Sequence, residues 1–452
     1  MGLTRFHCPW QTRFSRLHVV LLAVFSLAIT SLFASPVFLP EPEEVFTGSE
    51  AGAWARVERL SDPHPGFTQE AFCAAGEQND PWIIKWFGGD TTPHSRSFLL
   101  HCAKGFEGKT LPEPILLVHG AGDNANRAWI HPYAHSLPQK ISEKERGFAL
   151  WLSDLGYAVF AVSFAHNQGC NIMQAEHVAN AISRIRTLMK REGDPNFKVN
   201  VVAHSKGNVV TRIYCSDAPK IFPKKKFLSA FRKDVDTYIG IGPAFRGIDT
   251  PFRYYGYNLQ IATQKNSNGP VAAESLLLYG FWRNMKEMSL YKDAANYFPG
   301  QCQLLFNLVR DANVPLGVES MTLDMVTPYA LYFGGISPLM TSRGIEKAID
   351  EGERLIYRLE EQGFNPNMKI GVIAGSSPFI TYKDAFTLTP MPWEYLTPAG
   401  DGLVYLASAL HTDNAIKRGA KLIGKKTVDL NHVDIGRNRD VVRIIDDWLQ
   451  AH

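Results

Sequence analysis

Short apolar runs alternate with longer amphipathic stretches from about residue 114 onward, with one interruption. A short continuous apolar run is typical of a strand buried on both faces, and apolar residues at helical spacing are typical of a helix. Strands that alternate with helices predict a parallel sheet covered by helices on both faces, so the expected fold class is α/β. The predicted strands are 115–118, 157–164, 197–203, 235–241, 368–374 and a segment near 403–406, and the predicted helices are 147–155, 173–191, 206–214 and 344–362.

Two segments depart from this rhythm. Residues 35–110 carry many Pro, Gly and acidic residues, and within them the alternating segment 82–87 and the segment 97–102 read as strands that add to one edge of the sheet. Residues 245–365 are dense in aromatic residues and methionine, above all between 276 and 291, and predict a mostly helical insertion. The expected organisation is a leader at 1–34, an N-terminal extension at 35–110, a core at 111–244 and 366–452, and the insertion at 245–365.

The leader has the composition of an export signal. Its basic residues are three arginines, it contains no acid, and an apolar run at 17–33 is followed by the small residue Ala34. This pattern predicts a secreted or periplasmic protein. The run also approaches the length that spans a bilayer, so an uncleaved leader would anchor the chain and associate it with a membrane. No later stretch is apolar enough to span.

The charge and the cysteine content limit which partners, metals and cofactors the sequence predicts. The net charge of +3 comes from the three leader arginines, because without them 44 basic residues face 44 acidic ones. A neutral chain has no electrostatic footprint for nucleic acid, so no nucleic-acid partner is expected. Export permits disulfides, and Cys73 with Cys102 is a candidate pair. No CxxC or Cys/His metal spacing occurs, so neither a metal nor a cofactor is predicted.

A serine at a tight turn is the strongest chemical signal. The sequence 203–207, AHSKG, follows a predicted buried strand and opens a predicted helix. A serine on such a turn has strained backbone angles and needs tiny neighbours two residues away, and here Ala203 replaces the first glycine of the usual pattern. The helix N-terminus also favours negative charge that develops beside the serine. Ser205 is therefore a candidate nucleophile, although a chance serine in a strand–helix turn would look similar.

A glycine-containing segment follows an earlier strand. His119 to Gly122, HGAG, can aim a backbone N–H at a developing oxyanion, and the natural pair of donors is the N–H groups of Ala121 and Lys206. The alternative is a phosphate-binding glycine turn. That alternative is weaker, because GxGxxG is absent and Asp123 would face the anion.

Two late loops supply a candidate acid and base. GDGLV places Asp401 and NHVD places His432, which gives the order Ser, Asp, His along the chain. The histidine would take the serine proton, and the aspartate would fix its tautomer and stabilise the imidazolium. The competing acids are Asp384, Asp413, Asp429 and Asp434. The competing histidines are His166, His204 and His411, of which His411 is expected to be structural and His204 to point away from the serine into the fold.

At this point the chain resembles an α/β-hydrolase of the secreted bacterial lipase type, class 2 lipase-like, with polyhydroxyalkanoate depolymerases as close relatives. The matching motifs lie within 115–250 and 368–445 and read LLVHGAG, VNVVAHSKGN, YIGIGPAFRGID, GDGLVYLASAL and LNHVDIG. The resemblance implies that Ser205, Asp401 and His432 are catalytic, that Ala121 and Lys206 form the oxyanion hole, and that the insertion is a lid.

Two departures qualify the resemblance. Lys206 stands where this type of lipase has an uncharged residue. Some relatives bind a structural calcium through an acid just after the histidine; Asp434 stands there, but no second carboxylate is identified, so no calcium is predicted.

The resemblance implies a serine carboxylic-ester hydrolase that forms an acyl-enzyme and acts on an apolar ester, a lipid or a polyester, without a cofactor. A polyester depolymerase, a thioesterase or an acyltransferase would use the same three residues, and so would a serine peptidase. A non-catalytic binding protein on the same fold is the alternative from another class. The presence of both Ser205 and His432 argues against it.

Overall fold

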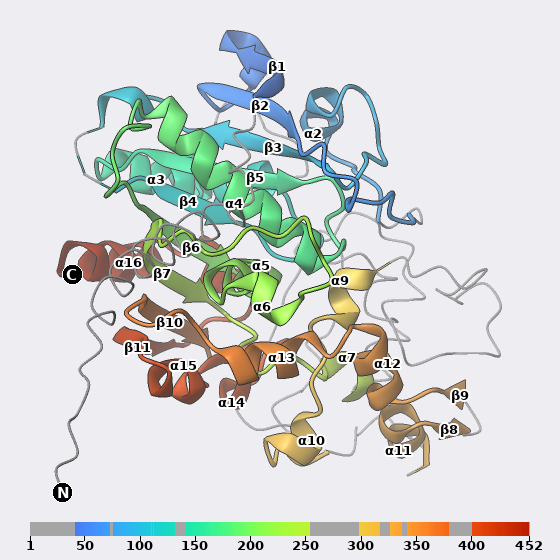
Figure 1. The fold of residues 1–452 in the computed structure, drawn as a ribbon. Helices are drawn as coiled ribbons and strands as arrows, with labels where there is room; N and C mark the ends of the chain where they lie inside the picture. Colours follow the sequence, from blue (N-terminus) through green and yellow to red (C-terminus); the bar gives the residue numbers. More distant parts are fainter. Residues whose placement is uncertain are drawn as a thin grey trace, which may run out of the picture. The chain divides into compact units, whose positions relative to one another are not determined.

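The computed structural model describes residues 41–72, 76–109, 111, 113–131, 141–253, 298–316, 326–336, 341–378 and 400–451. Residues 39–452 form one compact unit, whose described elements are drawn in Figure 1. The predicted leader lies outside the described residues. No helix in the described part of the chain is long and apolar enough to cross a membrane.

A nine-stranded sheet organises the fold. Its strand order is β1-β2-β3-β5-β4-β6-β7-β10-β11, in which β1, β2 and β3 are antiparallel to their neighbours and all pairs from β5 to β11 are parallel. The strands are β1 Pro42–Thr47, β2 Arg56–Ser61, β3 Ser97–Cys102, β4 Ile115–Val118, β5 Val159–Phe164, β6 Val199–His204, β7 Val235–Ile241, β10 Lys369–Gly375 and β11 Lys421–Val428.

Helices cover both faces of this sheet, as predicted. Alternate side chains of β4 separate two cores: Leu116 and Val118 pack with the face that holds α4 and α5, and Ile115 and Leu117 with the face that holds α3 and α16. The helices are α2 Pro81–Trp86, α3 Phe148–Asp154, α4 Asn171–Leu188, α5 Lys206–Cys215, α6 Ala218–Ile221, α7 Thr250–Arg253, α9 Pro299–Cys302, α10 Leu308–Asp311, α11 Val326–Phe333, α12 Ile345–Glu351, α13 Leu355–Gln362, α14 Leu406–Ala409, α15 Asp413–Lys417 and α16 Arg439–Ala451.

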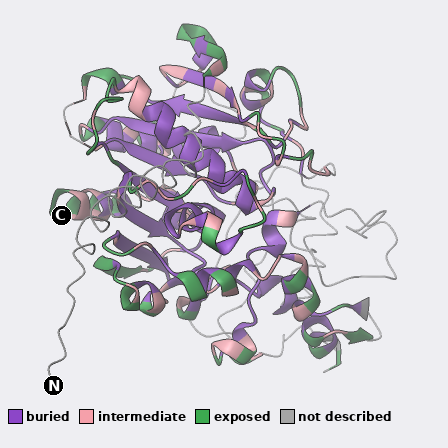
Figure 2. Cartoon of the chain, viewed as in Figure 1, coloured by how far each residue is buried: buried purple, intermediate pink, exposed green. Residues whose placement is uncertain are grey.

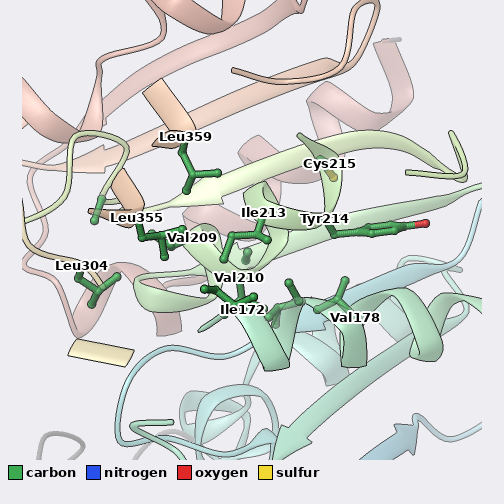
Figure 3. Packing of buried hydrophobic residues seen from close by; sticks show 14 of the residues in the cluster. Ile172, Val178, Val209, Val210, Ile213, Tyr214, Cys215, Leu304, Leu355 and Leu359 are labelled. Carbon is green, nitrogen blue, oxygen red and sulfur yellow. The ribbon is translucent and has the colours of Figure 1, made fainter. Parts of the chain in front are cut away.

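The helix that follows Ser205 is buried on every side. Figure 3 shows side chains of α5 lying between Ile172 and Val178 of α4 and Leu355 and Leu359 of α13. Every residue of α5, Lys206 to Cys215, is buried. Figure 2 shows the contrast with β11 at the sheet edge, where most residues are partly or fully exposed. The start of α5 is therefore held rigidly.

The predicted edge strand at 97–102 is confirmed as β3, which pairs with β5. The strand predicted at 82–87 is wrong, because the chain there forms α2. Asp80 caps this helix by accepting the N–H groups of Trp82 and Ile83, and Pro81 occupies its first turn. Alternation over six residues does not separate a strand from one and a half turns of capped helix.

Two further predictions need correction. The segment near 403–406 is not a strand, because the Asp401 carboxylate accepts the N–H groups of Leu403 and Val404 and turns the chain into α14. The helix predicted at 344–362 is two helices, α12 and α13. The break between them holds Glu353 and Arg354 at φ 57° and 51°, outside the helical region.

The described part of the insertion holds α7 and α9 to α13, with one short hairpin formed by β8 Gly335–Ile336 and β9 Thr341–Ser342. A buried ion pair joins its first helix to α11: Arg253 Nε lies 2.7 Å from Asp249 Oδ1, and the Tyr332 hydroxyl donates to Asp249 Oδ2 at 2.7 Å. The aromatic stretch 276–291 lies outside the described residues.

The thiol of Cys102 is free and buried in β3. It is therefore not half of the candidate pair with Cys73, a residue outside the described part of the chain.

Candidate active site

Ser205 stands between β6 and α5 with φ 52°, a conformation rare for any residue but glycine. The crowding around the turn explains the small neighbours. A side-chain carbon added to Gly207 would lie 2.5 Å from the carbonyl oxygen of Val118, and one added to Gly120 would lie 2.9 Å from Ser205 Cβ. The strained turn lifts the serine hydroxyl out of the sheet end and toward the late loops.

Those loops bring His432 and Asp401 to the serine. His432 Nε2 lies 2.7 Å from Ser205 Oγ, and His432 Nδ1 donates to Asp401 Oδ2 at 2.8 Å. Asp401 and His432 are 1% and 4% exposed, so water competes weakly for these hydrogen bonds. The three residues singled out by the sequence thus form one continuous hydrogen-bonded chain.

Backbone hydrogen bonds fix the positions of Asp401 and His432 relative to one another. The N–H of His432 donates to the carbonyl oxygen of Asp401 at 2.8 Å, while the other Asp401 carboxylate oxygen accepts the N–H of Val404 at 2.7 Å. Both oxygens of the carboxylate are therefore occupied. This leaves His432 one orientation in which its Nε2 faces the serine.

His204 has a role that the sequence did not reveal. Its Nε2 donates to the carbonyl oxygen of His432 at 2.9 Å, and the two rings lie 5.0 Å apart between centroids. The expectation that His204 points away from the serine into the fold omitted this contact. Burial, followed by the neighbouring His432, lowers the pKa of His204 to about 4, so the ring is neutral at pH 7.

The other competing acids and histidines have different surroundings. Asp434 accepts from Asn431 at 2.6 Å and from Arg437, and His411 lies 2.9 Å from Glu360. Asp413 and Asp429 are exposed, His166 stacks on Phe72, and Asp384 lies outside the described residues. Within the described part of the chain, no group of three or more His, Cys, Asp or Glu side chains has the geometry to hold a metal ion.

The candidate oxyanion donors flank the serine. Lys206 follows it at the first position of α5, and Ala121 precedes Gly122, whose φ is 66°. Among the described residues, neither the Ala121 N–H nor the Lys206 N–H donates to a backbone carbonyl in a turn, loop or cap. Asp123 follows the HGAG segment directly, and its carboxylate stays there, paired with Arg127 at 2.8 Å. A carboxylate at this place repels a phosphate, which argues against the alternative of a phosphate-binding turn.

The Lys206 side chain turns into the protein. It is 2% exposed, and its ammonium donates to Gln174 Oε1. Burial lowers the pKa of Lys206 to about 7, and burial raises the pKa of Glu70, the acid whose charge it feels, to about 7. No sequence signal singled out Glu70 or Gln174.

Part of the chain that contains Ser205 is similar to one known protein family. Residues 112–265 match the family described as lipase (class 2). No curated protein is significantly similar to the chain in sequence. Among solved structures, the mature lipase BlEst2 of Bacillus licheniformis is 14% identical, with a TM-score of 0.38, over 77% of this chain and 97% of that one.

Two other solved structures are of the same kind. A carboxylesterase of Nitrososphaera gargenis is 14% identical, with a TM-score of 0.34, over 78% of this chain and 94% of that one. A hydrolase of 2-hydroxy-6-oxo-6-phenylhexa-2,4-dienoate from Rhodococcus sp. strain RHA1 is 13% identical, with a TM-score of 0.32, over 78% and 95%. The part of the chain that resembles class 2 lipases, 112–265, contains β4 to β7 and the Ser205 turn, and the mainly parallel sheet with helices on both faces has the α/β-hydrolase architecture.

Proposed function

We propose that the protein is a serine carboxylic-ester hydrolase in which Ser205 is the nucleophile, His432 the base and Asp401 the orienting acid. The observation that carries this proposal is the hydrogen-bonded chain from Ser205 Oγ through His432 to Asp401, with distances of 2.7 and 2.8 Å. A nucleophile within hydrogen-bond reach of a base that a third group orients is the arrangement that activates a hydroxyl.

The reaction has two halves. Ser205 Oγ attacks the ester carbonyl carbon while His432 Nε2 takes the hydroxyl proton, and the N–H groups of Ala121 and Lys206 stabilise the oxyanion. The carbon–oxygen bond to the alcohol then breaks, and His432 gives its proton to the departing alcohol. In the second half, water attacks the acyl carbon while His432 takes a proton from it; the bond between that carbon and Ser205 Oγ then breaks, His432 returns the proton to Ser205 Oγ, and the acid leaves.

The substrate that we propose has an apolar acyl group. Support comes from the apolar side chains that α11 and the following hairpin expose, namely Tyr329, Phe333 and Ile336, at 48%, 56% and 78%. Water-facing apolar groups on the predicted insertion suit a lid or cap that meets a lipid or a polyester. The leader composition supports an exported enzyme that meets such substrates outside the cytoplasm.

The test measures hydrolysis of nitrophenyl esters from short to long acyl chains by the full chain and by Ser205→Ala. We expect hydrolysis in the wild type and a loss of at least about 10³-fold in the variant, with an unchanged melting temperature. Rising rates toward long chains indicate a lipase, and a preference for short chains indicates an esterase or a polyester depolymerase. Equal inertness of both proteins on every ester would instead favour a binding protein on the same fold.

A further inference from the structure

The side chain of Lys206 occupies a pocket on the inner side of the serine turn. The pocket is formed by Phe164 at the end of β5, Gln174 of α4 and Gly300 of α9, and the charge of Glu70 from the N-terminal extension acts on the ammonium. The ammonium donates to Gln174 and lies 5.8 Å from the centroid of the Phe164 ring. We call this set of residues the Lys206 pocket.

Glycine makes room for both charged groups. A side-chain carbon on Gly300 would lie 2.6 Å from Lys206 Cε, and one on Gly169 would lie 2.5 Å from Glu70 Oε2. Glu70 in turn accepts the N–H of Cys170 at 2.7 Å, which ties the extension to the loop before α4. The charges of Lys206 and Glu70 act on one another, so each favours the ionised form of its partner.

The loop before α4 also binds the insertion. Asn171 Nδ2 donates to the carbonyl oxygen of Gly300 at 2.9 Å, and the N–H of Gly300 donates to the carbonyl oxygen of Gln168 at 2.9 Å. Gln301 adds a side-chain bond to Gln168 at 2.7 Å. The serine turn, the extension, the loop before α4 and the insertion therefore meet around one lysine side chain.

Stability alone does not account for an ammonium at this position. Removing a charged group from water costs several kcal/mol, as an order of magnitude, and an apolar side chain of similar length fills such a pocket at no such cost. The position is also special, because the backbone N–H of the same residue is a proposed oxyanion donor. The charge of Lys206 acts on His119, which begins the segment carrying the second donor, Ala121.

We infer that Lys206 is a positioning residue for ester cleavage: its side chain, held by its hydrogen bond to Gln174 and attracted by the charge of Glu70, fixes the N–H that follows Ser205 where the oxyanion forms. This inference rests on the proposed function. An oxyanion donor acts only if it is placed before the reaction, and a displacement of about 1 Å can cost about 10²-fold in rate. A tether on the donor residue itself is a direct way to prevent that displacement.

The test compares Lys206→Met with the double variant Lys206→Met, Glu70→Gln. Methionine keeps the length and removes the charge, and the second change removes the acid that the first leaves without its cation. We expect kcat on the best nitrophenyl ester to fall about 10- to 100-fold in both variants, with KM within about twofold of the wild type. The double variant should recover the melting temperature that the single variant loses.

Lys225→Met is the matched control, because it also removes a lysine that pairs with an acid, Glu353, at 2.9 Å. Its kcat should equal that of the wild type. Recovery of wild-type kcat in the double variant would overturn the inference, because the lysine would then serve only to neutralise Glu70. A loss expressed in KM with kcat unchanged would overturn it too. An inert wild type would instead overturn the proposed function, and the inference with it.

Discussion

At the scale of single residues, His432 is held at its ring and at its backbone. Its ring contacts Ser205 and Asp401, its N–H contacts the Asp401 carbonyl, and its own carbonyl accepts from His204. A base that is fixed in this way needs no reorganisation when the proton moves, which is the property that preorganised sites share.

The first prediction concerns the tautomer of His432. Asp401→Asn should lower kcat about 10³- to 10⁴-fold with little change in KM, because an amide in place of the carboxylate no longer enforces the Nδ1–H form. The measurement is steady-state ester hydrolysis. Asp413→Asn, which changes an exposed acid that the sequence offered as a competitor, is the control and should keep wild-type kcat. Comparable losses in the two variants would refute the assignment.

The second prediction concerns His204. His204→Phe keeps a ring in place but removes the N–H that binds the His432 carbonyl, so kcat should fall by about 3- to 10-fold, the effect expected from losing one hydrogen bond. The effect should be the same from pH 6 to 8, because the pKa of His204 is lowered to about 4 and the ring is neutral throughout. An unchanged kcat, or a loss that grows as pH falls in this range, would contradict it.

Motifs predicted the three residues that form the hydrogen-bonded chain, because the proposed chemistry fixes residue type and local backbone at Ser205 and limits the candidates for its two partners to Asp401, His432 and a few competitors. They could not predict Glu70 or Gln174. These two lie far from Ser205 in the sequence, and the hydrogen bond of Gln174 and the charge of Glu70 reach Lys206 only once α4 and the extension have packed.

At the scale of elements, the sequence predicted the buried strands but missed the strands at the two edges of the sheet. β4 to β7 and β10 carry continuous apolar runs because helices cover them on both faces. β11 lies at the edge and reads KLIGKKTV, with lysines that protect an exposed edge and hide the strand pattern. β1 and β2 were missed for a similar reason, since charged residues punctuate both.

The third prediction belongs to α13. Arg212 of α5 and His411 both contact Glu360, and despite its burial the Arg212 charge and these hydrogen bonds lower the pKa of Glu360 to about 2. A carboxyl with a folded pKa below its unfolded value of about 4.5 contributes stability above that value, and the contribution is lost as pH falls toward 2. Glu360→Gln should therefore lower the free energy of unfolding at pH 7 by about 3 kcal/mol.

Denaturant unfolding at a series of pH values measures this effect. The difference between wild type and Glu360→Gln should shrink as pH falls from 4.5 to 2. Glu361→Gln changes the exposed neighbour on the same helix and should stay within about 0.5 kcal/mol of the wild type. A difference that is constant over the whole pH range would contradict the pairing.

At the scale of the whole molecule, the extension is part of the central sheet. β2 pairs with β3, and β3 pairs with β5 of the core. Glu58 of β2 is fully buried and binds Arg184 of α4 through both carboxylate oxygens, at 2.7 and 3.1 Å. The sequence predicted that the extension adds strands to the sheet, of which 97–102 is β3, but it predicted neither β2 nor this ion pair, because Glu58 and Arg184 meet only in the folded chain.

The fourth prediction follows from that pair. Glu58→Gln leaves the Arg184 charge without its main partner and should cost about 3 kcal/mol of unfolding free energy in a single transition shared by extension and core. Glu43→Gln, at an exposed pair with Arg59, is the control and should be nearly neutral. A separate early transition in Glu58→Gln would mean that the extension folds independently.

The central claim is that Ser205 forms an acyl-enzyme. The most direct measurement is mass spectrometry of the full chain after brief reaction with a slow nitrophenyl ester, followed by digestion to locate the added group. The account predicts one acyl group per chain on the peptide that contains Ser205, accumulation of this adduct in Asp401→Asn to a lower level, and no adduct in Ser205→Ala. Ester hydrolysis without an adduct on Ser205, or an adduct that persists in Ser205→Ala, would contradict it.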